Sequence, residues 1–377
     1  MSMNAGLTGQ GNLLILLFLL AWLLIYSLGS RFRLRERGLD IKPFILILRT
    51  KKVNGLLELL AGKLRRPLPV MSNISLVLGV GLTAFATYIF VKNLYSFFFR
   101  VEEAFPIFPA VPVLTIRETL PYFLLSAGII ILVHEFAHGV VARHEKVDVK
   151  SAGIVLLGLI PGGFVEPDEE SFKKAEREKK LRILAAGSSA NLVFGLLMIL
   201  LIVALFPPAG VMVNQVVEES PAAEAGLQAG DIIKSVNGVP TSHLEAFRRE
   251  MEKVSVGSTV VLRVEFHNGT QADLAVATMG AEDDETRAIV GIYPSNYVRF
   301  MNYYWAVFWV QVWSINIAIF NMLPIYPLDG DGFFYHLAEK YVGQRARLLR
   351  VGLTGFYLLL LGLNITLTFM RFGFISI

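Results

Sequence analysis

The sequence predicts a polytopic α-helical membrane protein with a small α/β domain inserted between two of its membrane spans. Of the 377 residues, 54% are hydrophobic and only 18% are charged. The apolar residues gather into runs that are too long for the core of a soluble domain. One interval, residues 209–286, departs from this pattern and shows the alternation and turn signals of a small globular domain.

About six apolar stretches are long enough to be membrane spans. A helix needs about 20 predominantly apolar residues to cross the hydrocarbon core of a bilayer. The predicted spans are residues 12–29, 73–98, 119–142, 181–206, 302–323 and 347–370.

Lys and Arg in the loops predict the orientation of these spans. They are frequent in residues 31–70, 143–182 and 340–350, whereas the loop 99–118 holds only two. Because cytoplasmic loops carry the excess of Lys and Arg, the three basic loops are expected inside the cell. Both termini and the inserted domain are then extracytoplasmic. The first span is expected to be a retained anchor rather than a cleaved signal peptide.

The excess positive charge, +4 overall, lies in loops next to the membrane spans. Anionic lipid headgroups are therefore its expected partners, and nucleic acid is not. Residues 41–66 combine the apolar run Phe44–Leu48 with several Lys and Arg, which predicts a segment lying on the cytoplasmic surface. The chain has no cysteine, which excludes disulfides, thiolate metal ligands and a cysteine nucleophile.

The inserted interval has the pattern of a mixed α/β domain. Alternating apolar residues predict strands at 211–217 and 259–266, and a helix is expected at 243–254. Asn237-Gly238 and Asn268-Gly269 are signals for hairpin turns.

The third predicted span contains the sequence His-Glu-Phe-Ala-His at residues 134–138. Positions four apart share one face of a helix, so His134 and His138 can offer their imidazoles to one metal ion. Glu135 lies beside that metal and is placed to be a general base. An ionised side chain at the centre of a membrane helix costs about 2.5 to 3.5 kcal/mol on insertion scales, so the cluster requires a compensating purpose. A metal ion supplies one.

A catalytic zinc site also needs a third protein ligand and an open position for water. The segment Asn321-Met-Leu-Pro-Ile-Tyr-Pro-Leu-Asp-Gly330 lies at the cytoplasmic end of the fifth span. Its two prolines are expected to break the helix, and Asp329 follows the break. The third span brings His134 about 20 Å along its inward course, and the fifth delivers Asp329 near the same face. Topology therefore allows these side chains to lie at similar depth.

These two motifs, in this order and with an inserted domain, resemble the site-2 protease family of intramembrane zinc metalloproteases. The resemblance covers residues 119 to 335. It implies one Zn²⁺ ion, with Glu135 as the catalytic base and Asn321 assisting substrate or transition-state binding. The implied metal ligands are His134, His138 and Asp329. The Leu-Asp-Gly match favours Asp329 over Asp331 as the third ligand.

The inserted domain resembles the PDZ domains attached to bacterial and archaeal proteases, most specifically between Ser220 and Ile233. PDZ domains bind an extended peptide at a sheet edge and hold its terminal carboxylate in a nest of backbone amides. By resemblance, that nest includes Gly210, Val211 and Met212. The domain is thus expected to bind a peptide or a substrate ectodomain; the alternative is that it only shields the membrane site sterically.

Two further segments fit the family. Residues 153–163 resemble its glycine-containing segment that dips into the membrane, where an extended strand pairs with unwound substrate; Gly153 and Gly158 are the expected contacts. Gly187-Ser-Ser-Ala-Asn191 matches Gly-Pro-x-x-Asn except that Ser188 replaces the proline. Asn191 either hydrogen-bonds near the site or joins two helices.

These expectations divide the chain into four parts. Residues 1–118 hold the N-terminal membrane helices and the surface segment, and residues 119–208 hold the first half of the protease core. Residues 209–286 form the PDZ-like domain. The second half of the core and the last membrane helix occupy residues 287–377.

The predicted function is hydrolysis of peptide bonds within or near transmembrane segments of other proteins, in the cell membrane, with the active site toward the cytoplasm. A membrane transporter is one alternative, but it predicts internal repeats of broken helices that this sequence does not show. An inactive PDZ scaffold is the other. The intact Glu135 argues against it, because a scaffold has no need of a base.

Overall fold

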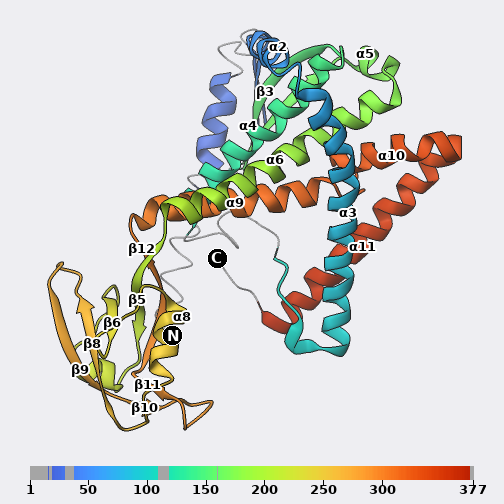
Figure 1. Ribbon diagram of the computed structural model, residues 1–377. Helices are drawn as coiled ribbons and strands as arrows, with labels where there is room; N and C mark the ends of the chain where they lie inside the picture. Colours follow the sequence, from blue (N-terminus) through green and yellow to red (C-terminus); the bar gives the residue numbers. More distant parts are fainter. Residues whose placement is uncertain (1–15, 17–18, 30–37, 109–118, 159, 374–377) are drawn as a thin grey trace. The chain divides into compact units, whose positions relative to one another are not determined.

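The computed structural model describes residues 16, 19–29, 38–108, 119–158 and 160–373 (Figure 1). The chain divides into two compact units. Unit 1 comprises residues 1–198 and 309–377, and unit 2 comprises residues 199–308. The boundaries between the units fall inside two long helices, so each unit is described separately.

Unit 1 is built around long apolar helices. Five stretches among the described residues are long and apolar enough to cross a membrane, which confirms the predicted class of polytopic helical membrane protein. They are α3 (Leu68–Phe99), α4 (Leu120–His144), α6 (Arg177–Leu205), α9 (Met301–Asn321) and the pair α10 (Asp329–Val342) and α11 (Ala346–Phe372). Of the first predicted span, 12–29, the structure describes residues 16 and 19–29, and Leu19–Gly29 is an apolar helix shorter than the five others.

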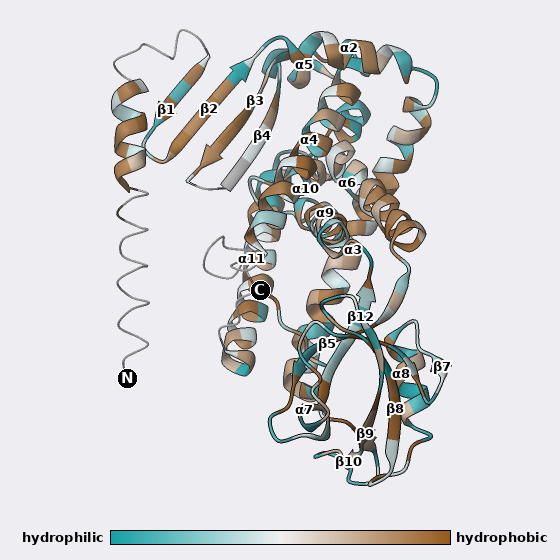
Figure 2. Cartoon of the chain, turned by 90° about the vertical axis from the view of Figure 1, so that its left-hand side faces the viewer, coloured by the Kyte–Doolittle hydropathy of each residue, from teal (hydrophilic) through white to brown (hydrophobic). Residues whose placement is uncertain are grey.

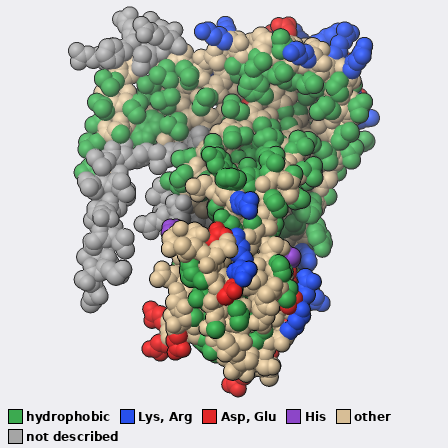
Figure 3. All heavy atoms as spheres, turned by 60° about the vertical axis from the view of Figure 1, so that its left-hand side comes forward, with side chains coloured by type: hydrophobic (Ala, Val, Ile, Leu, Met, Phe, Trp, Pro, Cys, Tyr) green, Lys and Arg blue, Asp and Glu red, His purple; other side chains and the backbone are tan. Residues whose placement is uncertain are grey.

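Hydrophobic side chains cover most of the visible surface of unit 1, and its helices are coloured mainly as hydrophobic (Figures 2 and 3). Lys and Arg side chains gather at one end of this unit in the space-filling view. Such a surface fits a lipid environment, because an apolar exterior is stable in hydrocarbon while charged side chains remain at its border.

Polar side chains join α3 to α11 within the apolar body of unit 1. The buried Asn93 donates from Nδ2 to Asn364 Oδ1 at 3.0 Å, and Thr87 and Tyr357 share a hydroxyl hydrogen bond of 2.6 Å. Such bonds between membrane helices are worth about 0.6 kcal/mol on average. They fix how these two helices pack.

Unit 1 also contains a four-stranded antiparallel sheet in the order β1-β2-β3-β4. Its strands are β1 (Leu39–Lys42), β2 (Ile45–Thr50), β3 (Val149–Leu157) and β4 (Ile160–Pro167). The segment 41–66, predicted to lie on the cytoplasmic surface, is not a membrane-spanning helix, and its surface location stays a prediction. Residues 41–42 and 45–50 are strands, because the apolar run Ile45–Leu48 pairs with residues 154–157 of β3, about a hundred residues away. Only the rest forms a helix, α2 (Val53–Lys63).

Short elements complete unit 1. The helix α5 (Glu169–Lys174) follows β4, and Asp168 caps it by accepting a hydrogen bond from the Ser171 amide. That bond holds the pKa of Asp168 below its usual value. Two single turns of 3₁₀ helix lie at Val101–Glu103 and Gly343–Arg345.

Unit 2 contains an antiparallel sheet with the order β12-β5-β6-β8-β9, to which β7 adds by pairing with β6. The strands are β5 (Pro208–Val216), β6 (Ile232–Val236), β7 (Val239–Pro240), β8 (Thr259–Glu265), β9 (Gln271–Ala277) and β12 (Ile292–Val298); β10 (Met279–Gly280) and β11 (Ala288–Ile289) form a separate pair. The helices are α7 (Pro221–Glu224) and α8 (Leu244–Met251), close to the predicted 243–254. Both predicted strands are present, and the sheet continues to Val298, beyond residue 286.

Candidate metal centre

The helix α4 places His134 and His138 one turn apart on a buried face. Their exposures are 6% and 9%, and their Nε2 atoms lie 3.1 Å apart. The four-residue spacing produces this geometry, because the side chains project from successive turns on the same side. The two ring planes are tilted by 79° to each other, so the imidazoles do not stack. Their Nε2 atoms instead point to one place.

The third side chain comes from a helix start nearly two hundred residues later. The helix α9 ends at Asn321, Pro324 and Pro327 lie in the connection, and α10 begins with Asp329. The Oδ2 atom of Asp329 lies 3.0 Å from His134 Nε2 and 3.1 Å from His138 Nε2. The structure thus brings the three predicted ligand atoms into one cluster.

The cluster has the dimensions of a zinc site. Ligands placed tetrahedrally at about 2.0 to 2.1 Å from zinc lie about 3.3 Å from one another. The three atoms form a triangle with edges of 3.0, 3.1 and 3.1 Å. These three atoms would hold the ion. Two neutral imidazoles and one carboxylate are also a donor set that zinc accepts.

Hydrogen bonds behind the two histidines orient them toward this centre. The Nδ1 atom of His138 donates to the carbonyl of Ile183 at 2.6 Å, which leaves Nε2 free to bind a metal. Asn191 Nδ2 lies 3.2 Å from His134 Nδ1, while the buried Asn191 Oδ1 has no hydrogen-bond partner. Turning this amide by 180° lets Oδ1 accept from His134 Nδ1–H. In that arrangement His134 Nε2 is also free for a metal.

Gly187 allows α6 to approach the two histidines. A Cβ atom on residue 187 would lie 2.3 Å from His138 Nε2 and 2.6 Å from His134 Cε1. Any side chain here would therefore collide with the metal-binding atoms. The predicted segment 187–191 thus contributes twice, through the glycine and through the hydrogen bond of Asn191; Ser188 is fully buried within α6.

Glu135 lies on the next position of α4 and faces β4. Its Oε2 atom accepts a hydrogen bond of 2.7 Å from the backbone amide of Val165. Close packing makes this contact possible, since a Cβ on Gly163 would lie 2.4 Å from Ile131 Cγ2 and 3.4 Å from Glu135 Cγ. One carboxylate oxygen is thereby fixed, and the other remains available for proton transfer.

Asn321 also reaches the centre. Its Nδ2 atom lies 3.3 Å from His134 Nε2. The Asn321 amide is therefore close to the place where a metal ion and a reacting group bound to it would lie. Asn321 and Asp329 stand at the two ends of the connection between α9 and α10. One short segment therefore supplies both groups.

The glycines predicted to contact substrate lie in the sheet of unit 1, but not at its open edge. Gly153 is in β3, paired with Arg49 of β2 on one side and with Phe164 of β4 on the other. Gly158 occupies the turn after β3 with a φ of 62°. Because β4 is the outer strand beside the metal centre, an added strand would pair with β4 rather than with Gly153.

The predicted amide nest is likewise engaged within unit 2. The amide of Gly210 donates to the Ser242 carbonyl at 2.9 Å. Val211 and Met212 lie in β5, which pairs with β6 on one side and with β12 on the other. The structure therefore does not assemble these three residues as an open nest. The outer strands of this sheet are β12 and β9.

Sequence reasoning missed the amide of Val165 and the steric role of Gly187. The first carries no sequence signal, since every residue except proline has such an amide. The second had one, because glycine in a membrane helix is enriched where another helix approaches closely.

Comparison with known proteins agrees with this site. The model of peptidase family M50 matches residues 122–363. An uncharacterized protein of Methanocaldococcus jannaschii is 29% identical over 327 residues, covering 85% of this chain and 83% of that protein. The regulator of sigma-E protease RseP of Escherichia coli is 27% identical over 186 residues, and the match covers 41% of each chain, less than half of RseP.

A PDZ domain of an SdrC-like protein from Listeria innocua is similar to 23% of this chain and is itself covered to 96%, with 25% identity and a TM-score of 0.21.

The resemblance predicted from the two motifs is confirmed by the family match, which spans both motifs. The chain belongs to peptidase family M50, the family of the site-2 proteases.

Proposed function

We propose that this M50 peptidase is an intramembrane zinc metalloprotease that hydrolyses peptide bonds in or near the transmembrane segments of other membrane proteins. The observation that carries the proposal is the convergence of His134, His138 and Asp329 beside Glu135. The cluster is drawn from two helical stretches that are apolar enough to cross a membrane. Buried titratable groups at this depth are costly and mark functional sites.

His134, His138 and Asp329 would hold zinc, which would act as a Lewis acid toward water and the scissile carbonyl. The free oxygen of Glu135 takes a proton from the attacking water while the Val165 amide keeps the carboxylate in place. The water oxygen bonds to the carbonyl carbon, and the bond from that carbon to nitrogen breaks. Glu135 then passes the proton to the leaving nitrogen, which departs as an amine.

The substrate must be unwound where it is cut, because the hydrogen bonds of a helix cover its scissile bonds. The outer edge of β4 offers a place for the unwound segment. The Val165 amide points away from β3 toward Glu135, so by the two-residue period of a strand the backbone of Gly163 also faces outward. A segment paired with Gly163 would lie next to the base.

The inserted PDZ-like domain acts, in this proposal, on the part of the substrate outside the membrane. A peptide that adds as a strand would use an outer strand of its sheet, β12 or β9. The Lys and Arg in residues 31–70, 143–182 and 340–350 support a topology in which these loops and the metal centre face the cytoplasm and both termini lie outside. The remaining partner is the lipid bilayer.

Replacement of Glu135 by Gln tests the proposal. The amide keeps the size of the side chain but cannot take a proton, so E135Q should cleave a reporter membrane protein at least about a hundredfold more slowly. Zinc content should stay at the wild-type value, because the ligands are intact. Glu58→Gln, on the exposed face of α2, is the matched control and should cleave normally. Wild-type cleavage by E135Q would disprove the mechanism.

A further inference from the structure

Asp331 lies two residues after the metal-binding aspartate but faces a different neighbour. Positions two apart on a helix are separated by about 200° around its axis. Asp329 points to the two histidines, whereas the Asp331 carboxylate accepts hydrogen bonds from Nε of Arg350 at 2.7 Å and from its Nη2. Asp331 is 4% exposed, so a nearly buried carboxylate sits on the opposite side of the turn that carries the metal ligand.

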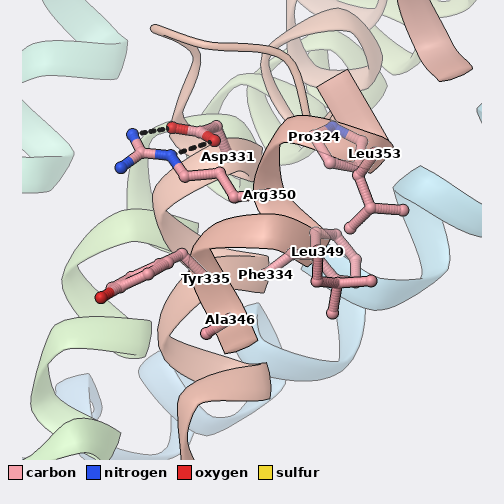
Figure 4. Close-up of a pocket in the computed structure, with 8 residues that line it drawn as sticks. All are labelled: Pro324, Asp331, Phe334, Tyr335, Ala346, Leu349, Arg350 and Leu353. Atoms are coloured by element: carbon pink, nitrogen blue, oxygen red, sulfur yellow. Dashed lines mark hydrogen bonds and ion pairs between the residues drawn. The ribbon is translucent and has the colours of Figure 1, made fainter. Parts of the chain in front are cut away.

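The guanidinium of Arg350 touches three parts of unit 1 at once. Arg350 belongs to α11, and its planar group lies 5.5 Å from the ring of Tyr335 on α10. It also lies 5.3 Å from the ring of Tyr326, in the connection between α9 and α10. Figure 4 shows the two hydrogen bonds to Asp331 and the neighbouring Tyr335 and Pro324. Arginine suits this role because its rigid fork binds a carboxylate in two places while its faces contact aromatic rings.

The connection between α9 and α10 is held at other points as well. Thr83 donates to the carbonyl of Met322 at 2.6 Å, and Thr354 donates to the carbonyl of Pro324 at 3.3 Å. A Cβ on Gly330 would lie 2.2 Å from the Met322 carbonyl oxygen, so the start of α10 packs directly on this segment. Arg350 adds an ion pair to Asp331, two residues after Asp329.

The cavity beside the ion pair of Asp331 and Arg350 is small, about 10 Å³, which is the space of one water molecule. It is lined by Asp331, Arg350, Tyr335 and apolar residues of α10 and α11. The cavity has no room for a substrate group. The ion pair therefore acts on the shape of the protein rather than on a ligand.

We propose that Asp331 and Arg350 are positioning residues of the metal centre. Their ion pair fixes the rotation of the first turn of α10 and the path of the preceding connection, so that Asp329 Oδ2 and the Asn321 amide both face His134. This inference rests on the proposed function in one respect, the assignment of Asp329 as a metal ligand. Supporting contacts behind metal ligands commonly change metal affinity by about 10- to 100-fold when they are lost.

The test is the zinc affinity of the purified protein, measured by competition with a chelator. Asp331→Asn and Arg350→Gln should each weaken zinc binding about 10- to 100-fold. The double variant D331N/R350Q should be no weaker than the weaker single variant, because both changes remove one interaction. Arg350→Lys keeps the charge but not the fork and should restore only part of the affinity. Arg347→Gln, exposed on the same helix, is the matched control.

Two outcomes separate the failure of this inference from the failure of the proposed function. If Asp329→Asn binds zinc as tightly as wild type, the ligand assignment itself is wrong. If Asp329→Asn loses zinc while D331N and R350Q stay within about twofold of wild type, the positioning role is overturned. Should a single variant not fold, the apolar pair D331L/R350M avoids an unpaired buried charge and decides the question in the same assay. Wild-type affinity in that variant overturns the proposal.

Discussion

At the scale of single residues, the metal centre depends on a few closely packed atoms, and larger side chains would collide with them. The two histidines and Asp329 form a triangle about 3 Å on edge, comparable with the spacing in zinc sites. Behind them stand a glycine that admits a neighbouring helix and an asparagine that orients one ring. Substitutions at these two supporting positions are expected to affect metal binding before they affect the fold.

Gly187→Ala should abolish zinc binding. The added methyl group would lie 2.3 Å from His138 Nε2, so either the ring or the α6 helix must shift. Gly128→Ala, on the metal-binding helix α4, is the matched control because its Cβ would meet nothing within 4 Å. Zinc content per chain measures the effect. A G187A protein that holds one zinc with wild-type affinity would refute the close approach described for α6.

Asn191→Ala should lower zinc affinity about 10- to 100-fold by releasing the ring of His134. Asn316→Ala, an exposed asparagine whose amide bonds only to its own helix, serves as the control. Chelator competition distinguishes the two variants. Equal affinities would assign Asn191 to helix packing alone, the other role weighed for it from the sequence.

The two histidines and Glu135 could be grouped from the sequence because helical spacing fixes their relation locally, whereas Asp329 was implied by the family motif. The segment of five residues that begins at His134 holds both histidines and Glu135. Two prolines before Asp329 predict the helix break. The Val165 amide and Arg350 could not be predicted, since each meets its partner only through tertiary packing. The amide nest at residues 210–212 stays a prediction, and the pairing of Val211 and Met212 with β12 was not predictable because their partners lie some 80 positions away.

At the scale of elements, the contact between β4 and α4 connects the sheet of unit 1 to the metal centre. The glycine at position 163 lets the strand lie against the helix, and the amide at 165 holds the base. The helix boundaries were predictable because long apolar runs have few other structures available. The pairing of β2 with β3 was not, because strand register is set by partners distant in sequence.

Gly163→Ala should slow cleavage while leaving zinc in place. Its methyl group would lie 2.4 Å from Ile131 Cγ2 and push β4 away from α4, so Glu135 would lose its fixed position. A displacement of this size near reacting groups costs about a hundredfold in rate. Reporter cleavage and zinc content are measured together, with Gly62→Ala on α2 as control. Normal cleavage by G163A would show that β4 does not position the base.

Asn364→Leu should destabilise the packing of α3 against α11. The change removes the hydrogen bond from Asn93 and the bonds to the Phe90 and Leu360 carbonyls, and keeps the number of side-chain heavy atoms. The free energy of unfolding in detergent should fall by about 0.6 to 1.7 kcal/mol. Asn316→Leu should have no such effect. An unchanged stability would mean that this polar contact contributes only to helix register.

At the scale of the whole molecule, all three metal ligands, Glu135 and the β4 edge belong to unit 1, whereas the PDZ-like domain belongs to unit 2. Metal binding is therefore expected to be independent of the inserted domain. Selection of substrates is the property that the domain can change, through peptide binding at a sheet edge or through steric exclusion.

Replacing residues 209–298 with a Gly/Ser linker should leave zinc affinity within about twofold of wild type, because no ligand is removed. Cleavage of a reporter with a large ectodomain then distinguishes the two roles. Slower cleavage indicates that the domain binds substrate, and faster cleavage indicates that it excludes it. Loss of zinc from the shortened protein would contradict the independence of the two units.

We propose that one zinc ion is held jointly by α4 and by the start of α10. X-ray absorption at the zinc edge tests it most directly, on E135Q protein loaded with one equivalent of zinc. The claim predicts the scattering pattern of two imidazoles, with nitrogen and oxygen ligands at about 2.0 to 2.2 Å. A shell made only of oxygen, or one without imidazole scattering, would contradict it.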